Sequence, residues 1–490
     1  MTARPNILYI MSDDHAANAI SCYGSRLAAA APTPNLDRIA REGMRLDNCF
    51  CTNAICTPSR ATIMTGQYSH VNGVYTLADA LDRERPNAAK TLQAAGYQTA
   101  VIGKWHLKTR PSGFDYYNVL PGQGLYHDPL FKEKGKPWAD SHEGGEKVEG
   151  YVTDLIADFS LDWLKRRDPD RPFFLMCHHK APHDHWEYDE KHAETHKGVT
   201  FPEPESLWED KSHRSEGSRD YGSTIYTLAA GRMSQDWYPT GKLDIAGMSR
   251  DDVKRAAYQK YMHDYLRCVA SIDDNVGRLL EYLDEADLAE DTVVIYTSDQ
   301  GQFLGEHDYY DKRWIFEEAL RMPFLVRYPR EIEAGTVNKD IILNTDFAPT
   351  FLDYAGQATP SDMQGRSFRP ALTGNRPPDW RASMYYRYWM HMAHHSNPAH
   401  YGVRTQRYKL IFFYGLPLDA SGAEPEPTAP GMELYDLEKD PKELHNVYDD
   451  PAYADAVREL KEELLRLKAE LGDADEQYPD LMRVRERSFR

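Results

Sequence analysis

Short apolar runs recur along most of the chain, and longer amphipathic stretches separate them. The runs cover Asn6–Met11, Thr99–Ile102, Pro172–Cys177, Thr292–Thr297 and Pro323–Tyr328. Their length suits buried strands, and near-continuous apolar strands are typical of parallel sheets that are covered on both faces. Helical periodicity marks Thr33–Glu42, Leu155–Arg166, Val253–Asp284 and Asp346–Ala355. The alternation predicts an α/β fold built on a large, mostly parallel sheet with helices on both faces.

The chain changes character at Gly374–Asp379, where the sequence Gly-Asn-Arg-Pro-Pro-Asp predicts a linker or a long turn. Beyond it lie a strand-like run at Tyr408–Tyr414, a polar segment at Ala420–Pro430 and an amphipathic helix at Ala452–Glu470. We therefore expect one large domain over residues 1–378 and a smaller α+β domain over residues 379–490. The polar segment His192–Met248 predicts a long insertion beside the functional site.

The charge of the chain argues against several classes of partner. Lys and Arg total 58 against 77 Asp and Glu, which gives a net charge of -19 and disfavours a general electrostatic grip on nucleic acid or anionic lipid. No stretch approaches the roughly 20 apolar residues that span a bilayer, and the run after Pro5 is too short for the core of a signal peptide. We therefore expect a cytoplasmic protein that binds neither nucleic acid nor membrane. Whether it forms a homo-oligomer stays open.

Polar side chains follow two of the predicted strands, at the point where each strand ends. Asp13 and Asp14 come after the first run, and Asp299 and Gln300 follow the run that starts at Thr292. Ligands of open α/β sheets gather outside the carboxyl ends of the strands. Carboxylate and amide oxygens are hard ligands, so these residues form a candidate site for one Ca2+, with Mg2+ or Mn2+ as alternatives. The competing interpretation is that each Asp is a turn former or a helix cap.

The most specific motif begins at Cys56. Taken alone, Cys56 would be interpreted as a small buried hydrophobe, and the six cysteines of the chain contain no CxxC pair. Together, however, Cys56, Pro58, Ser59, Arg60, Thr65 and Gly66 resemble the signature of the type I, formylglycine-dependent sulfatases. The resemblance implies that a dedicated maturation enzyme oxidises Cys56 to formylglycine.

The resemblance extends over most of the chain. Further matches to the family's motifs are Gly103–Leu107, Ala181–His183, Leu304–His307, Tyr310–Lys312 and, in the C-terminal part, Glu433–Leu437. Membership of this family implies an alkaline-phosphatase-like fold, in agreement with the alternation of strands and helices. It also implies that the large domain is the catalytic one.

The resemblance further implies a role for each matched residue. The implied catalytic residues are Cys56, Arg60, Lys104, His106, His183 and Lys312, and the implied metal ligands are Asp13, Asp14, Cys56, Asp299 and Gln300. The hydrated aldehyde would attack the sulfur of a sulfate monoester, with His183 as the acid for the leaving alcohol and His106 as the base that releases sulfate. His307 and His400 are expected to line the substrate pocket.

The exact residues of three further motifs indicate a branch of the family. Ser298–Gly301, Tyr310–Lys312 and His400–Arg404 resemble the branch that contains N-acetylglucosamine-6-sulfatases and arylsulfatases. Gln300 departs from the Asn or His of many members, but it keeps a carbonyl oxygen for a hard cation. The predicted activity is therefore hydrolysis of a small carbohydrate, aryl or alkyl sulfate.

Three other interpretations stay open at this point. A phosphonate monoester or phosphodiester hydrolase on the same scaffold would use the same metal, diol and lysines. A non-catalytic carbohydrate-binding relative would have kept the fold without turnover. A two-zinc phosphatase is disfavoured, because the extra His and Asp ligands for a second metal are not recognisable in the sequence.

Overall fold

The computed structural model describes residues 4–139 and 143–490. The first three residues, which belong to the segment considered above for a signal peptide, lie outside the described residues. Its main feature is a ten-stranded sheet with the strand order β13-β2-β12-β9-β1-β8-β4-β5-β6-β7. The inner strands are β9 (Thr292–Ser298), β1 (Asn6–Ser12), β8 (Phe173–His178), β4 (Gln98–Lys104) and β5 (Tyr116–Leu120). The outer strands are β13 (Thr336–Asn338), β2 (Met44–Leu46), β12 (Phe324–Arg327), β6 (Leu130–Glu133) and β7 (Glu146–Lys147).

The centre of this sheet is parallel. Strand β1 pairs with β8 on one side and with β9 on the other, and β4 pairs in parallel with both β8 and β5. Antiparallel pairs occur toward the edges, where β12 lies between β9 and β2 and where β6 follows β5. The predicted large, mostly parallel mixed sheet is confirmed.

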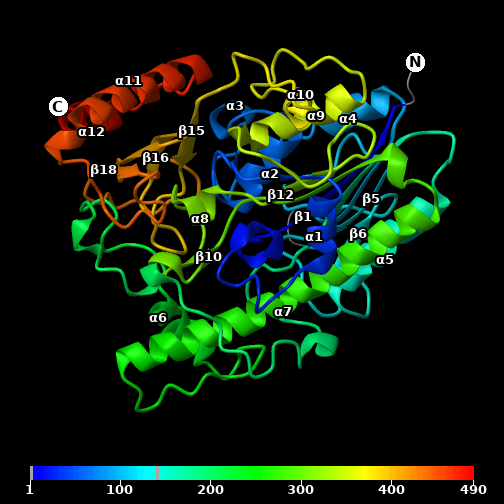
Figure 1. Cartoon of the computed structure of the whole chain (residues 1–490), viewed down its shortest axis with the longest axis horizontal. Helices are drawn as coiled ribbons and strands as arrows, with labels where there is room; N and C mark the ends of the chain where they lie inside the picture. Colours follow the sequence, from blue (N-terminus) through cyan, green and yellow to red (C-terminus); the bar gives the residue numbers. More distant parts are fainter. Residues whose placement is uncertain (1–3, 140–142) are drawn as a thin grey trace.

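Helices cover both faces of the sheet, and the side chains of β1 show why. Ile7 and Tyr9 belong to one apolar cluster, whereas Leu8 and Ile10 belong to the other, because successive side chains of a strand point to opposite faces. Figure 1 shows the two helical layers on opposite sides of the sheet. One layer contains α2 (Cys56–Thr65), α4 (Ala88–Ala94) and α9 (Phe347–Tyr354), and the other contains α1 (Pro34–Arg41), α5 (Val152–Arg166) and α7 (Arg250–Glu285).

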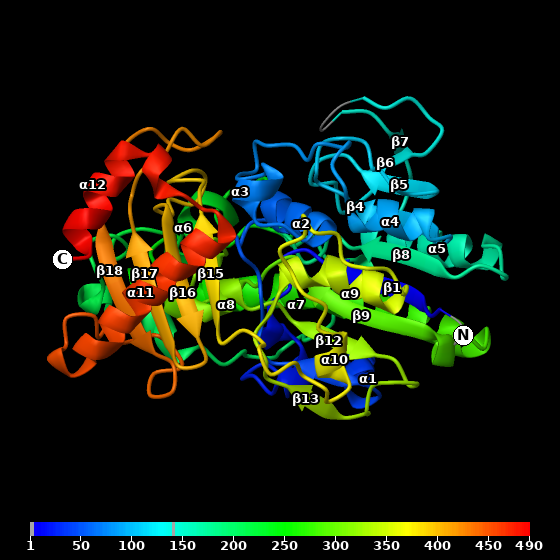
Figure 2. The same cartoon turned by 90° about the horizontal axis from the view of Figure 1, so that it is seen from above.

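A second, smaller sheet lies at the C-terminal end (Figure 2). Its antiparallel strands are β15 (Ser383–Tyr388), β16 (His400–Thr405), β17 (Tyr408–Phe413) and β18 (Gly431–Asp436), packed against α11 (Ala454–Leu471) and followed by α12 (Pro479–Ser488). This arrangement confirms the expected α+β character of the C-terminal part. The apolar core is shared between the two sheets, since Tyr9 of β1 and Leu464 of α11 belong to one continuous cluster.

Buried charges attach the C-terminal helices to this second sheet. Asp473 follows α11 and accepts hydrogen bonds from Arg387 of β15 at 2.7 Å and from Lys468 at 2.9 Å. Asp475 lies 3.0 Å from Lys468 and accepts a hydrogen bond from Arg485 of α12 at 2.7 Å. We call these five residues the C-terminal clamp.

The remaining segments are short. The insertion predicted at His192–Met248 contains only brief helical turns, among them α6 (Ile225–Leu228) and the π-helical turn Ala229–Met233. The other small elements are α3 (Ser69–Asn72), α8 (Glu317–Leu320), α10 (Arg369–Leu372), β3 (Cys49–Phe50), β10 (Phe303–Leu304), β11 (Tyr310–Asp311) and β14 (Ile342–Leu343). Within residues 4–139 and 143–490, no helix has the length and apolar character that crossing a membrane requires.

Candidate active site

The central parallel strands bring the predicted metal ligands together. Ser12 of β1 is in register with Ser298 of β9, so the residues that follow each strand emerge at the same edge of the sheet. Carboxylate oxygens of Asp13, Asp14 and Asp299 all lie within 4.8 Å of one another, and all three residues are buried. Asp14 has a φ of 64°, a left-handed conformation that aspartate tolerates better than most residues.

Cys56 lies directly against this cluster. It is the first residue of α2, its side chain is buried, and its Sγ is 3.5 Å from Oδ1 of Asp13. Cys56, Asp13 and His183 also have ligand atoms within 4.8 Å of one another. Burial raises the pKa of the Cys56 thiol to about 12, although the ammonium of Lys312 opposes the shift. The unmodified side chain would therefore be a poor nucleophile at neutral pH.

Three buried cations face the three carboxylates. Lys104 contacts Asp13, Lys312 lies 2.5 Å from Asp14, and Nε of Arg60 lies 2.9 Å from Asp299. Arg60 also donates a hydrogen bond from Nη1 to the carbonyl of Lys104 at 2.7 Å. The guanidinium thus connects α2 to the end of β4, and each carboxylate has a cationic partner.

Gly103 explains how Lys104 reaches this position. A Cβ at residue 103 would lie 2.0 Å from the carbonyl oxygen of His178 on the neighbouring strand β8. Gly103 also has a φ of 99°, which side chains rarely allow. The close approach of β4 to β8 therefore requires glycine immediately before the lysine.

Burial and neighbouring charge set the protonation of the cluster. Burial raises the pKa of Asp14 to about 7, with Asp299 adding to the shift and Lys312 opposing it. The pKa of Asp299 is lowered, because Arg60, Lys104 and Lys312 together outweigh the effect of burial. Burial also lowers the pKa of Lys104 well below its usual value. Carboxylates held this close to one another favour the binding of a cation.

His183 lies at the side of the cluster. Its Nε2 is 3.7 Å from Oδ2 of Asp14, and its Nδ1 is 2.9 Å from Oδ1 of Asp184. Burial lowers the pKa of His183 to about 3, with Lys104 and Lys312 contributing and Asp184 opposing. The ring is therefore neutral at neutral pH.

The sequence patterns did not identify three residues that support these groups. Asp184 holds His183, and Arg232 of the π-helical turn pairs with Asp184. Gln123 accepts a hydrogen bond from Nζ of Lys104 through its Oε1. The position of Asp184 directly after the histidine was a usable signal. Gln123 and Arg232 lie in segments without a motif, so only the fold reveals them.

His106 follows Lys104 by two residues and adopts a left-handed φ of 52°. Its side chain is buried and borders a small hollow together with Trp105, Lys108 and Trp138. His106 therefore lies just after the end of β4, close in sequence to Lys104, and its side chain lines this hollow.

The structure buries the two predicted substrate residues. His307 is fully buried, with its Nδ1 2.6 Å from Glu209 and its ring stacked on Phe316. His400 is also fully buried, with its Nδ1 2.8 Å from the carbonyl of Pro398. Protein encloses both rings, as it also encloses Lys104 and Gln300 of the candidate site, so the role of the two histidines in the substrate pocket stays a prediction.

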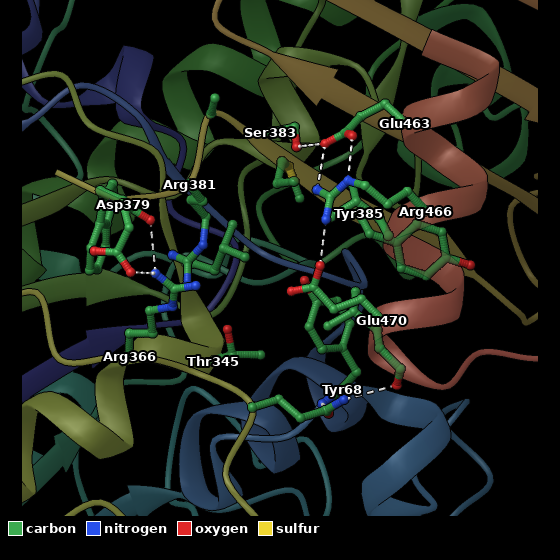
Figure 3. Close-up of a pocket in the computed structure, with 17 residues that line it drawn as sticks. Tyr68, Thr345, Arg366, Asp379, Arg381, Ser383, Tyr385, Glu463, Arg466 and Glu470 are labelled. Atoms are coloured by element: carbon green, nitrogen blue, oxygen red, sulfur yellow. Dashed lines mark hydrogen bonds and ion pairs between the residues drawn. The ribbon is translucent and has the colours of Figure 1, made fainter. Parts of the chain in front are cut away.

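A hollow of about 370 Å³ lies between the linker, β15 and α11 (Figure 3). Its charged side chains satisfy one another, since Arg366 pairs with Asp379 and Arg466 lies between Glu463 and Glu470. None of the described residues that line it belongs to the predicted site. We therefore place the candidate active site at the strand ends and not in this hollow.

The arrangement fits a hard divalent cation. Besides the three buried carboxylates, Oε1 of Gln300 is buried and has no hydrogen-bond partner. Nε2 of Gln300 donates to Asp299 at 2.7 Å and also contacts Asp14. Coordination through the amide oxygen would therefore require the amide group to turn over.

Comparison with known proteins identifies the family. The sequence model of the family described as Sulfatase matches residues 5–357, which is more than half of the chain. The chain belongs to the sulfatase family. A model described as N-sulphoglucosamine sulphohydrolase, C-terminal, matches residues 305–470 of this sulfatase. The protein is therefore a sulfuric ester hydrolase with the alkaline-phosphatase-like fold, as the resemblance implied.

Two relatives are similar along nearly the whole sulfatase. An N-acetylglucosamine-6-O-sulfatase of Bacteroides thetaiotaomicron is 40% identical, over 97% of this chain and 88% of the relative. A solved structure of a protein in complex with its substrate D-glucosamine-2-N,6-O-disulfate is 39% identical, has a TM-score of 0.85 and covers 98% of this chain and 99% of that chain.

A more distant neighbour shares only the fold. A phosphonate monoester hydrolase of Silicibacter pomeroyi has a TM-score of 0.71 at 21% identity, covering 95% of each chain. At this identity the likeness concerns the fold alone.

Proposed function

We propose that this sulfatase removes the 6-O-sulfate of a glucosamine-type sugar, with formylglycine made from Cys56 as the nucleophile. The observation that carries the proposal is the position of Cys56, whose buried sulfur lies against Asp13 and His183 within a cluster of three cations. The names of the two relatives that are about 40% identical support the sugar. A maturation enzyme would be needed to oxidise the thiol.

Asp13, Asp14, Asp299 and Gln300 would hold one divalent cation, for which we favour Ca2+, with Mg2+ or Mn2+ as alternatives. Together, the cation and a hydrated formylglycine would supply a deprotonated hydroxyl at neutral pH. Arg60 would keep Asp13 and Asp299 in place through contacts of 3.5 and 2.9 Å.

The lysines would bind the sulfate group. A sulfate monoester carries negative charge that repels an anionic nucleophile, so cations around it lower the barrier. Lys104 and Lys312 reach into the cluster from different segments, at Asp13 and at Asp14 respectively. The amino end of α2, which begins at Cys56, would add a favourable dipole.

Proton transfer would fall to the two histidines. His183 would protonate the leaving alcohol, and Asp184, 2.9 Å from its Nδ1, would stabilise the charged ring. A sulfate bound between Lys104 and Lys312 would offset their positive charge, which now helps to lower the pKa of His183 to about 3. His106 would accept the proton whose loss releases sulfate.

The test is a rate comparison on purified protein whose Cys56 peptide has been checked for the aldehyde by mass spectrometry. We expect N-acetylglucosamine-6-sulfate to be hydrolysed faster than its 3-sulfate isomer, aryl sulfates and aryl phosphodiesters. Faster turnover of phosphodiesters or phosphonate monoesters would instead favour the related hydrolase activity. An unconverted, inactive protein that binds the sugar would favour a non-catalytic role.

A further inference from the structure

The smaller sheet reaches the loop that precedes Cys56. Its first strand, β15, donates a hydrogen bond from the backbone nitrogen of Arg387 to the carbonyl of Thr52 at 3.1 Å. The hydroxyl of the preceding residue, Tyr386, accepts a hydrogen bond from the backbone nitrogen of Ala54 at 3.2 Å. The same hydroxyl donates to the carbonyl of Arg313 at 2.8 Å. One side chain of the C-terminal part therefore bridges two segments of the catalytic part.

Both segments carry groups of the candidate active site. Ala54 lies two residues before Cys56, and Arg313 comes directly after Lys312. The two segments also touch each other, since the backbone nitrogen of Arg313 donates to the carbonyl of Ala54 at 3.1 Å. We call the segment with Ala54 the nucleophile loop and the segment with Lys312 and Arg313 the lysine loop. Tyr386 connects these two loops through hydrogen bonds.

The tyrosine ring is itself held in place. Tyr386 is fully buried, and its ring stacks on His400 with a centroid distance of 5.6 Å and an interplanar angle of 26°. His400 is fixed in turn by the carbonyl of Pro398 at 2.8 Å. Because close packing prevents the ring from moving, the hydroxyl is a rigid point of attachment.

The lysine loop needs such a restraint. Asp311 and Arg313, on either side of Lys312, have φ values of 91° and 83°, which residues with a side chain rarely adopt. Backbone in such conformations persists only where surrounding contacts hold it. The hydrogen bond from Tyr386 to the Arg313 carbonyl is one of these contacts.

We propose that Tyr386 is a positioning residue, whose hydroxyl fixes the spacing between the nucleophile at Cys56 and the substrate-binding Lys312. The inference rests on the proposed function of these two residues. Its consequence is that the C-terminal sheet takes part in building the catalytic geometry. Transition-state binding is more sensitive to this spacing than ground-state binding, because misplacement by about 1 Å can cost on the order of 100-fold in rate.

The test compares Tyr386→Phe with Tyr414→Phe. Tyr414 is a matched control, because it is buried directly after β17 of the same sheet and its hydroxyl donates to a backbone carbonyl, that of Tyr388, at 3.2 Å. With N-acetylglucosamine-6-sulfate as substrate, we expect Tyr386→Phe to lower kcat by roughly 10-fold while KM changes by less than about 2-fold. Tyr414→Phe should keep the wild-type kcat within about 2-fold.

A second readout does not depend on turnover. Hydrogen exchange should become faster at the amide of Ala54 in Tyr386→Phe and stay unchanged in Tyr414→Phe, because only the first variant removes the acceptor of that amide. Unchanged exchange, or equal kcat for the two variants, would overturn the inference while wild-type activity still supports the proposed function. A wild-type enzyme without sulfate ester hydrolysis would overturn both.

Discussion

Two of the buried clusters of paired charges in this sulfatase differ in which polar atoms they leave without a partner. In the C-terminal clamp, both oxygens of Asp475 have partners: Oδ1 lies 3.0 Å from Lys468, and Oδ2 accepts from Tyr401 at 2.9 Å and from Arg485 at 2.7 Å. In the candidate active site, Gln300 has an unpartnered buried oxygen, and the carboxylates lie beside the thiol of Cys56.

The difference shows that buried charge alone does not mark a site. In the clamp every carboxylate oxygen has a partner within the protein, and these contacts hold α11 and α12 against the second sheet. The active-site cluster crowds three carboxylates at the ends of parallel strands and leaves an acceptor free, which favours a ligand. Substitutions in the two clusters should therefore have opposite effects on activity and stability.

The largest effect should come from Cys56→Ala. We expect turnover of sulfate esters to fall by on the order of 10^5-fold, because the nucleophile is lost, while the melting temperature stays close to that of the wild type. Steady-state rates and thermal unfolding would be measured on the same preparations. Cys22→Ala, at a partly exposed cysteine, is the control and should keep full activity. Retained turnover in Cys56→Ala would remove the basis of the comparison.

The next effect should come from Asp473→Asn in the clamp. Removing this carboxylate leaves Arg387 and Lys468 with Asp475 as their one remaining partner in the clamp, which should cost about 3 kcal/mol of unfolding free energy. Urea denaturation would measure the loss. At a temperature where the variant is folded, its kcat should equal that of the wild type.

The same carboxylate predicts a dependence of stability on acid. Burial raises the pKa of Asp473, but Arg387 and Lys468 outweigh it and lower the pKa in the folded state. A lowered pKa stabilises the fold above the ordinary aspartate value of about 4, and this stabilisation is lost as the pH falls toward the folded-state pKa. The wild-type melting temperature should therefore drop more steeply below about pH 4 than that of Asp473→Asn. Parallel curves would contradict the assignment.

Removal of the metal should affect the candidate active site and leave the C-terminal clamp unchanged. Dialysis against a chelator should abolish turnover, and readdition of Ca2+ at about 100 times its Kd should raise the unfolding free energy by about 3 kcal/mol. Asp299→Asn should lose most of this stabilisation, whereas Asp473→Asn should keep it. An equal response of the two variants would show that the cation does not bind at the strand ends.

The smallest effect should come from Asp184→Asn. The variant keeps the size of the side chain but removes the charge that supports protonated His183, so kcat should fall by roughly 10-fold to 100-fold. The loss should be larger for alkyl than for aryl sulfates, since poor leaving groups depend more on the acid. Asp158→Asn, which disturbs only an exposed pair with Arg278, is the control. Equal losses on both substrate types would argue against His183 as the acid.

Much of the large sheet could be predicted because its inner strands are continuously apolar. The run Asn6–Met11 corresponds to β1, and the run from Thr292 corresponds to β9. The short outer strands β2 and β13 were not predicted, because three residues carry no recognisable period.

Only some residues of the candidate site could be predicted from the sequence. The motif around Cys56 and the strand-end aspartates identified residues that the fold brings together. The expectation for His307 and His400 stays a prediction, because a motif locates a residue along the chain without giving the direction of its side chain. Gln123 and Arg232 could not be found at all, since their relation to Lys104 and Asp184 exists only after folding.

The continuous core described for the two sheets limits how this enzyme can be recombined with its relatives. A chimaera joined at residue 378 would separate Tyr9 and Leu464, which belong to one apolar cluster, and it would pair Tyr386 with a foreign nucleophile loop. Exchanging the C-terminal part would therefore mean redesigning the interior of its new host at the same time.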